Sequence, residues 1–282
     1  MPEIYLIQPS GEPIHLDEAK NDRRVIDSTD DSKFKSLIVA ARLAAESKTR
    51  RQLLHARIQL VLDRFPGGSG VALENQFNIP SYGIKLPRSP VVDVVSVQYT
   101  DMAGVLQTMP PTDYVVNLAM EPAVITPRFG KIWPIPLPQI GSVIVTYDAG
   151  YASPITVSHV ADASHFQVSG PVTWVVGDRV RFYNSGGSLP APLNADDTFL
   201  VSSANAGSYS LIDLAGNPIT FTDDGTGRNF IGVVPDGIRS WMLLRVGSLY
   251  ENREEVAILN RGKMELLPFV DGLLDPYLPS VY

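Results

Sequence analysis

The stretch 234–256, VPDGIRSWMLLRVGSLYENREEV, is the feature that most constrains the fold of this chain. Its larger side chains recur at intervals of three and four residues, the period of an amphipathic helix with one buried face. Asp236 stands where an N-cap residue is expected, and the charged run 251–255 marks the solvated end. The sequence therefore predicts a helix late in the chain that buries one face: Ile238, Trp241, Met242, the aliphatic part of Arg245, Val246, Leu249 and Tyr250.

Length and composition limit the class of protein. The 282 residues suffice for one large domain or two ordinary ones, and 44% hydrophobic residues with a mean hydropathy of +0.04 are typical of a soluble globular protein. No apolar run approaches the ~20 residues that span a bilayer, and the N-terminal MPEIYLIQPSGEP lacks the features of a signal peptide. The absence of cysteine excludes disulfides, a thiolate nucleophile and cysteine-based zinc sites. A net charge of −7 argues against a surface that coats nucleic acid.

Two further helices are predicted near the N-terminus. The first covers 16–23, with acidic residues in its first turn, and the second starts at Asp30 or Asp31 and runs to about Lys48. One side of the second helix collects Phe34, Leu37, Ile38, Ala41, Ala45 and Lys48. Its alanine pairs, 40–41 and 44–45, would let another helix approach closely. These small residues indicate either packing within the chain's own core or an interface between subunits.

The region 52–151 has the pattern of an antiparallel β unit. Residues 55–63 alternate between apolar and polar side chains, and 91–109 reads as a hairpin with a turn at 101–104. Short strands are predicted at 114–116, 123–126 and 142–147. Seven prolines between 110 and 138 keep these strands short and interrupt their edges.

Residues 155–233 differ from the rest of the chain in composition and in the spacing of turn residues. They contain no lysine, and turn signals recur about every ten residues, as expected of a small all-β sandwich or barrel. Because the helical pattern resumes directly afterwards, we expect 154–233 to be a domain inserted between 1–153 and 234–282. We expect its hydrophobic pattern to be self-contained. The predicted class is α+β: a helical core with an antiparallel β unit, plus an inserted all-β domain.

No catalytic or metal-binding constellation stands out. His159, Asp162 and His165 lie close in sequence, but a hairpin would hold them as solvated turn residues rather than metal ligands. The loop 67–70, Gly-Gly-Ser-Gly, lacks the Gly-Lys-Ser/Thr ending of a phosphate-binding loop and the last glycine of a nucleophile elbow. The run 223–227 has oxygen ligands for calcium, although an Asp-Gly turn explains it better.

The order of several moderately distinctive blocks resembles the head–tail connector (adaptor) proteins of long-tailed phages and of phage-derived gene transfer agents. The blocks are LDEAKNDRRV, DDSKFKSLIVAARLAAESKTRRQL, LVLDRFP, IKLPRSPVVDVVSVQYTDMAGVLQTMPPTDYVV, GKIWP, VIVTYDAGYA, VPDGIRSWMLLRVGSLYENREEV and LPFVDGLLDPYLP. They cover about 1–153 and 234–282. Arg23 departs from the family, which has an apolar residue at this point, and 155–233 resembles instead a β module of phage tail and fibre proteins.

The resemblance implies a structural virion protein without cofactor, metal or reaction. Family members are made in the host cytoplasm and form a ring in the virion neck, usually of twelve subunits, which extends the DNA channel without sequence-specific binding. The ring lies between the portal protein and a downstream stopper or tail-completion protein, away from any membrane. On this chain the predicted ring interface is Ala40, Arg42, Ala44, Arg50 and Arg51. The apolar, proline-interrupted C-terminal segment is the predicted portal-docking element, through Phe269, Leu273, Leu274, Tyr277 and Tyr282.

Two other classes remain open on the sequence. A carbohydrate-binding or adhesin-type tail protein would use the β insert, with Trp174, Phe182 and Tyr183 as sugar-stacking aromatics, although such residues in a β sandwich are more often core. A tail-associated hydrolase is disfavoured because no catalytic constellation was found.

Overall fold

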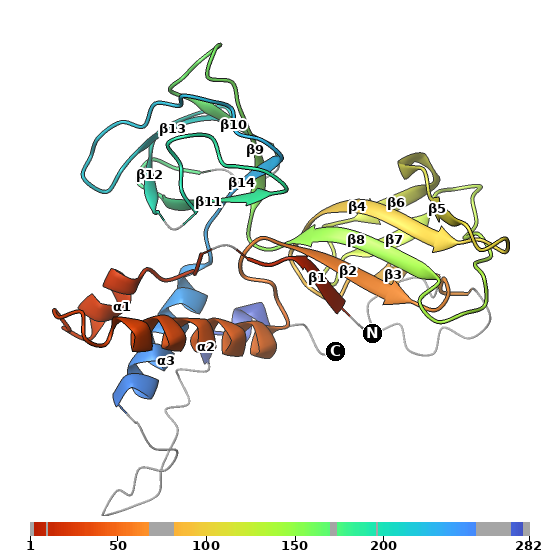
Figure 1. The fold of residues 1–282 in the computed structure, drawn as a ribbon, viewed down its shortest axis with the longest axis horizontal. Helices are drawn as coiled ribbons and strands as arrows, with labels where there is room; N and C mark the ends of the chain where they lie inside the picture. Colours follow the sequence, from red (N-terminus) through yellow and green to blue (C-terminus); the bar gives the residue numbers. More distant parts are fainter. Residues whose placement is uncertain are drawn as a thin grey trace, which may run out of the picture.

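The computed structural model describes residues 3–9, 11–67, 82–169, 174–195, 197–251 and 272–278. Three helices form one layer, two antiparallel sheets form a β unit on one side of it, and a closed barrel lies above the helices (Figure 1). The α+β class predicted from the sequence is confirmed. Among the described residues, no helix combines the length and apolarity needed to cross a bilayer.

The helical layer consists of α1 (Leu16–Asp22), α2 (Asp31–Thr49) and α3 (Asp236–Glu251), close to the predicted ranges. On α2 most of the predicted apolar face is buried, with Phe34, Ile38, Ala41 and Ala45 in the core that α2 shares with α3. Of the other two predicted residues, Leu37 is half-buried and Lys48 is exposed. Asp30 precedes α2, but it makes no side-chain capping bond to the helix. Its carboxylate instead accepts a 2.6 Å hydrogen bond from Tyr250 Oη, which ties the start of α2 to the end of α3.

The burial pattern of α3 follows the prediction with two corrections. Ile238, Trp241, Met242 and Val246 are buried, and Leu249 and Tyr250 are half-buried. Arg245 is exposed rather than packed along its stem, and the buried position next to Val246 is Gly247. Asp236 is the first helical residue rather than the N-cap, since the carbonyl of Pro235 accepts the amides of Ile238 and Arg239. The predicted continuation 252–256 lies outside the described residues.

Gly247 explains how Arg23 is accommodated at the end of α1. A Cβ at position 247 would overlap the Arg23 guanidinium, so a larger residue there would require the Arg23 side chain to move. The guanidinium forms ion pairs with Asp22 at 2.9 Å and with Glu251 at 3.0 Å. Arg23 therefore joins α1 to α3.

The β unit contains a five-stranded sheet packed on a three-stranded one. The first has the order β1-β2-β8-β4-β5 and the second the order β3-β7-β6, all antiparallel. The strands are β1 (Glu3–Ile7), β2 (Ala56–Leu62), β3 (Ile84–Lys85), β4 (Val91–Thr100), β5 (Leu106–Thr108), β6 (Tyr114–Asn117), β7 (Val124–Pro127) and β8 (Val143–Ala149). A short 3-10 turn, Pro111–Asp113, precedes β6. The predicted strands and the 101–104 hairpin turn are confirmed, whereas β1 and β3 were not predicted.

The segment predicted to be a sandwich or barrel is a closed six-stranded barrel. Its order is β10-β13-β12-β11-β14-β9, and the strands are β9 (Ser153–Val157), β10 (Phe166–Val168), β11 (Arg179–Ser185), β12 (Phe199–Asn205), β13 (Ser208–Ile212) and β14 (Arg228–Gly232). Closure leaves the barrel without free sheet edges. The chain enters it from β8 and leaves it into α3.

The hydrophobic pattern of the barrel is not self-contained, contrary to the expectation from sequence. Tyr183 of β11 and Phe230 of β14 are buried in the helical core rather than inside the barrel. Polar contacts add to this joint, because Arg228 of β14 forms ion pairs with Asp148 of β8 at 2.8 Å and with Asp93 of β4 at 2.9 Å. The barrel therefore contacts both the helical layer and the β unit.

Candidate assembly surfaces

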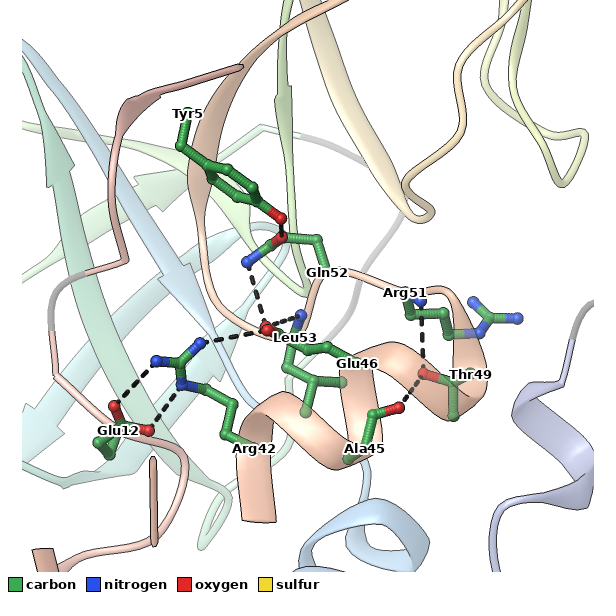
Figure 2. A network of polar contacts seen from close by, with 9 residues as sticks. All are labelled: Tyr5, Glu12, Arg42, Ala45, Glu46, Thr49, Arg51, Gln52 and Leu53. Carbon is green, nitrogen blue, oxygen red and sulfur yellow. Dashed lines mark hydrogen bonds and ion pairs between the residues drawn. The ribbon is translucent and has the colours of Figure 1, made fainter. Parts of the chain in front are cut away.

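A network of polar side chains around Glu46 joins the end of α2 to β1 (Figure 2). The buried Glu46 carboxylate accepts hydrogen bonds from the Leu53 amide at 3.2 Å, from Gln52 Nε2 at 3.2 Å and from Arg42 Nη1 at 3.1 Å. Tyr5 of β1 completes the network by donating from Oη to Gln52 Oε1 at 3.0 Å. These bonds fix the helical layer against the edge strand of the five-stranded sheet.

Arg42 is held in this network by two carboxylates. Besides Glu46, it binds the Glu12 carboxylate through Nε at 2.7 Å and Nη2 at 3.2 Å, a bidentate arrangement. Burial raises the pKa of Glu46, and the Arg42 guanidinium and the Leu53 amide only partly oppose it, so the pKa of Glu46 lies above its ordinary value. The predicted ring residue Arg42 thus has both carboxylate partners within its own subunit.

The other predicted ring residues divide into two groups. Arg51 also bonds within the subunit, from Nε to the Tyr277 carbonyl at 2.7 Å and from Nη1 to Glu121 at 2.8 Å. Ala44 is half-buried against the helical core. Ala40 and Arg50 are exposed, so these two face solvent in the single subunit.

Arg50 lies at the rim of a pocket between α2 and β1. It follows the last residue of α2 with φ of 53°, a left-handed conformation that is uncommon for a residue with a side chain. The pocket, which we name the Arg50 pocket, has a volume of about 610 Å³. Its walls include Tyr5, Pro9, Leu43, Arg50, Pro87 and Arg88.

The described part of the C-terminal segment packs on its own subunit. Leu274 is 1% exposed inside the helical core, and Leu273 and Tyr277 pack partly buried against it. The ring of Tyr277 lies against Gly237 at the start of α3. Residues 273–277 are therefore packed against the fold of their own subunit. Phe269 and Tyr282, the other predicted portal-docking residues, lie outside the described residues.

The β unit carries an exposed apolar surface that sequence reasoning did not identify. In the loop between β7 and β8, Phe129 is fully exposed, Ile132 is 86%, Ile135 79% and Ile140 91% exposed. We name these four side chains the distal tip, since the loop lies at the ends of β4 and β8 that point away from the helices (Figure 1). The prolines at 134, 136 and 138 were interpreted only as strand breakers. The signal that could have revealed the tip is a large apolar residue beside nearly every proline.

The aromatic residues of the adhesin alternative are not available to a sugar. Trp174 and Phe182 are buried in the barrel core, and Tyr183 is buried in the helical core. The alternative expectation, that they are core residues, is confirmed.

His159 and His165 each contact a different aspartate rather than forming a cluster. His159 Nδ1 lies 2.8 Å from Asp224 Oδ1, and His165 Nδ1 lies 2.8 Å from Asp162 Oδ2. Asp223, from the predicted Asp-Gly turn, accepts the amides of Gly225 and Ala191. Within the described ranges, no group of three or more His, Cys, Asp or Glu side chains is placed to hold a metal ion. The glycine loop 67–70 lies outside them, except for Gly67.

Comparison with known proteins identifies chains of similar fold. No family model matches the sequence, and no curated protein matches it. The fold is similar to that of a chain in the virion of a native gene transfer agent particle, with a TM-score of 0.56 and 14% identity. It is also similar to a chain in the neck of an empty gene transfer agent particle, computed with C6 symmetry, with a TM-score of 0.55 and 15% identity. Both alignments cover 100% of this chain and 97% of the other. At this identity the likeness is one of fold.

Proposed function

We propose that this chain is a structural subunit of a particle neck, a head–tail connector that assembles into a ring below the portal. The observation that carries the proposal is the fold likeness over the whole chain to a protein in the neck of a gene transfer agent particle. The role is one of assembly: the ring extends the channel through which DNA passes, without base recognition, a cofactor or a chemical step. The order of sequence blocks described above supports the same family independently of the fold.

Cyclic symmetry of the neighbour supports a ring of this chain. Its neck was computed with C6 symmetry, and a ring of twelve subunits, the usual number in the connector family, also satisfies a six-fold axis. The helical layer contacts both the barrel and the β unit, which suits it to the body of such a ring. The face of the ring that points away from the portal would meet a stopper or tail-completion protein.

The portal contact is proposed for the C-terminal segment. Leu274 is committed to the core, so the segment offers the half-exposed Leu273 and Tyr277 together with Phe269 and Tyr282. Arg51 supports this element by holding the Tyr277 carbonyl. The segment would therefore dock as an extension of the helical layer and not as a free tail.

The decisive experiment mixes the purified protein with the portal protein of the same particle at physiological salt and images the product by electron microscopy. We expect a ring of this protein on one end of the portal, with a portal of an unrelated phage as the control. Absence of any complex with the cognate portal would refute the proposal.

A further inference from the structure

The segment 32–62 is basic, although the chain as a whole is acidic. It contains seven of the 23 lysines and arginines but only one of the 30 acidic residues, Glu46, in a chain of net charge −7. Charge of one sign that gathers in one part of a protein gives that part an electrostatic field of its own, which the net charge of the whole chain does not reveal.

Three of the seven cations are used inside the subunit, where each pairs with carboxylates. They are Arg42 with Glu12 and Glu46, Arg51 with Glu121, and Arg57 with Asp148. The other four are Lys33, Lys35, Lys48 and Arg50, which all belong to α2 and its C-cap. The cations of this segment are thus divided between internal ion pairs and the surface of one helix.

These four side chains lie on the side of α2 that faces solvent, away from its buried apolar residues. Lys35, Lys48 and Arg50 are exposed, and Lys33 is half-buried. Glu46 is 6% exposed, so every exposed charged residue between positions 32 and 50 is positive. In the view of Figure 1, α2 crosses in front of α3, which leaves its outer side uncovered by the described elements.

The positive charge on this side is not neutralised by nearby acids of α2. Asp31 pairs with Lys20 at 2.6 Å, and Asp30 accepts from Tyr250. Among the described residues, no carboxylate pairs with Lys35 or Arg50.

An aromatic ring holds the ammonium group of Lys33 in place. Lys33 Nζ lies 4.5 Å from the ring centroid of Tyr250, a cation–π contact that orients the ammonium and leaves its charge in place. Lys48 Nζ lies 5.8 Å from the ring centroid of Trp241. Both rings belong to α3, so the two lysines lie along the groove between α2 and α3.

Small side chains separate the cations. Ser32, Ser36, Ala40 and Ser47 are exposed on the same side of the helix. Small residues let a partner's backbone approach the helix closely, and hydroxyls such as those of Ser32 and Ser47 are donors that phosphate oxygens accept. Lys33 and Arg50 are 17 residues apart, so the basic side extends about 25 Å along α2.

We propose that this side of α2, which we name the basic face (Lys33, Lys35, Lys48 and Arg50 with the small residues between them), contacts the phosphate backbone of duplex DNA in the channel of the ring. A duplex presents one negative charge per about 1.7 Å of its axis, which complements a long and uniformly positive helix side. Contacts of lysine, arginine and serine with phosphate carry no sequence information, so they suit DNA that passes without base recognition. The inference rests on the proposed function and adds which surface of the subunit faces the DNA.

Charge reversal at matched positions tests the contact. Lys35→Glu and Arg50→Glu are compared with Lys85→Glu and Arg128→Glu, which reverse exposed cations of the β unit. Each variant is assembled on the cognate portal, and its affinity for a short fluorescent duplex is measured by anisotropy at several salt concentrations, with the portal alone as the blank. Lys35→Glu and Arg50→Glu should lower the affinity at least about tenfold and flatten its salt dependence, whereas the two controls should change it less than about twofold.

A photocrosslink locates the contact, because the chain has no cysteine of its own. Ser36→Cys, labelled with an azidophenacyl group, should crosslink to the duplex in portal-bound rings. Val160→Cys is the control, since Val160 is 84% exposed in the loop between β9 and β10, and it should not crosslink. The substituted side chains are exposed, so the thermal midpoint of the single subunit should not move in any of these variants.

The two proposals fail in different ways. Rings that bind the duplex equally well with Lys35→Glu and Lys85→Glu, or that crosslink from position 160 and not from 36, would overturn the basic face and leave the ring in place. Loss of the ring with Lys35→Glu or Arg50→Glu, but not with the controls, would assign this side of α2 to a protein partner and would also overturn the DNA contact. Failure of the unmodified protein to form rings on its portal would refute the proposed function itself.

Discussion

Protonation of Asp148 should weaken the joint between the β unit and the barrel. The Asp148 side chain is fully buried, and its carboxylate contacts Arg57 at 2.8 and 3.0 Å and Arg228 at 2.8 Å. Burial by itself would raise the pKa of Asp148, but His55 and Arg57 outweigh it and hold the pKa at about 2, below the ordinary 3.8. The folded protein therefore keeps this carboxylate ionised in acid where the unfolded chain does not.

The sign and size of the effect follow from this shift. A depressed folded pKa contributes stability that is present above the unfolded pKa and is lost as the pH falls through the folded one. A shift of just under two pKa units corresponds to about 2 kcal/mol, lost between about pH 4 and pH 2. At neutral pH, Asp148→Asn should cost about 3–5 kcal/mol, since it leaves buried arginine charge without its partner.

Urea unfolding of the wild type and of Asp148→Asn across pH 7 to 2 measures this directly. The difference between their free energies of unfolding should stay constant down to about pH 5 and then shrink by about 2 kcal/mol. Asp93→Asn is the matched control, because Asp93 binds the same Arg228 but its side chain is 52% exposed, and it should cost at most about 1 kcal/mol. A difference that does not change with pH would refute the buried, ionised state of Asp148.

Three further stability predictions can be checked by urea or thermal unfolding. Leu274→Ala should cost about 2–5 kcal/mol because Leu274 is 1% exposed. Leu278→Ala, at an exposed position, should cost less than about 1 kcal/mol. An equally small cost for Leu274→Ala would place the C-terminal segment outside the core. Gly150→Ala should cost about 3 kcal/mol, since φ is +131° and a Cβ would overlap the Leu54 backbone, while Gly104→Ala in open space should cost about 1 kcal/mol. Joining residue 153 to 234 through a Gly/Ser linker should give a markedly destabilised or aggregating protein, because the deletion removes Tyr183 and Phe230 from the helical core; a shortened protein as stable as the full chain would contradict this.

Periodicity was sufficient where one face of an element is buried against one partner. The three-and-four spacing of Phe34, Ile38, Ala41 and Ala45 predicted α2, and the alternation in 55–63 predicted β2. Arg245 shows the limit, because a long side chain at a helical position can equally well point to solvent. Gly247 could not be assigned to the buried face, since its burial depends on Arg23, which is more than two hundred residues away in sequence.

The candidate surfaces were harder to predict because they depend on contacts between distant segments. Arg42 and Arg51 look like free cations in the sequence, yet their partners are Glu12, Glu46 and Glu121. The C-terminal segment is apolar whether it packs on its own subunit or on another, and composition does not distinguish the two. The distal tip was missed because the large apolar residues beside the prolines of 128–141 were not considered as an exposed surface.

The two buried carboxylates, Glu46 and Asp148, change the free energy of unfolding in opposite directions as the pH falls. Each lies at a different contact between parts of the fold. Burial raises the pKa of Glu46, so its contribution is present below its unfolded pKa and is lost as the pH rises through the folded value. The lowered pKa of Asp148 has the reverse effect over an acidic range. Glu46→Gln should therefore remove a loss of stability that occurs above the ordinary glutamate pKa, and Asp148→Asn should remove a loss of stability that occurs below the ordinary aspartate pKa. Because Glu46 holds α2 against β1 while Asp148 holds the barrel against the sheet, acid of about pH 2 should loosen the barrel and leave the wall of the Arg50 pocket in place.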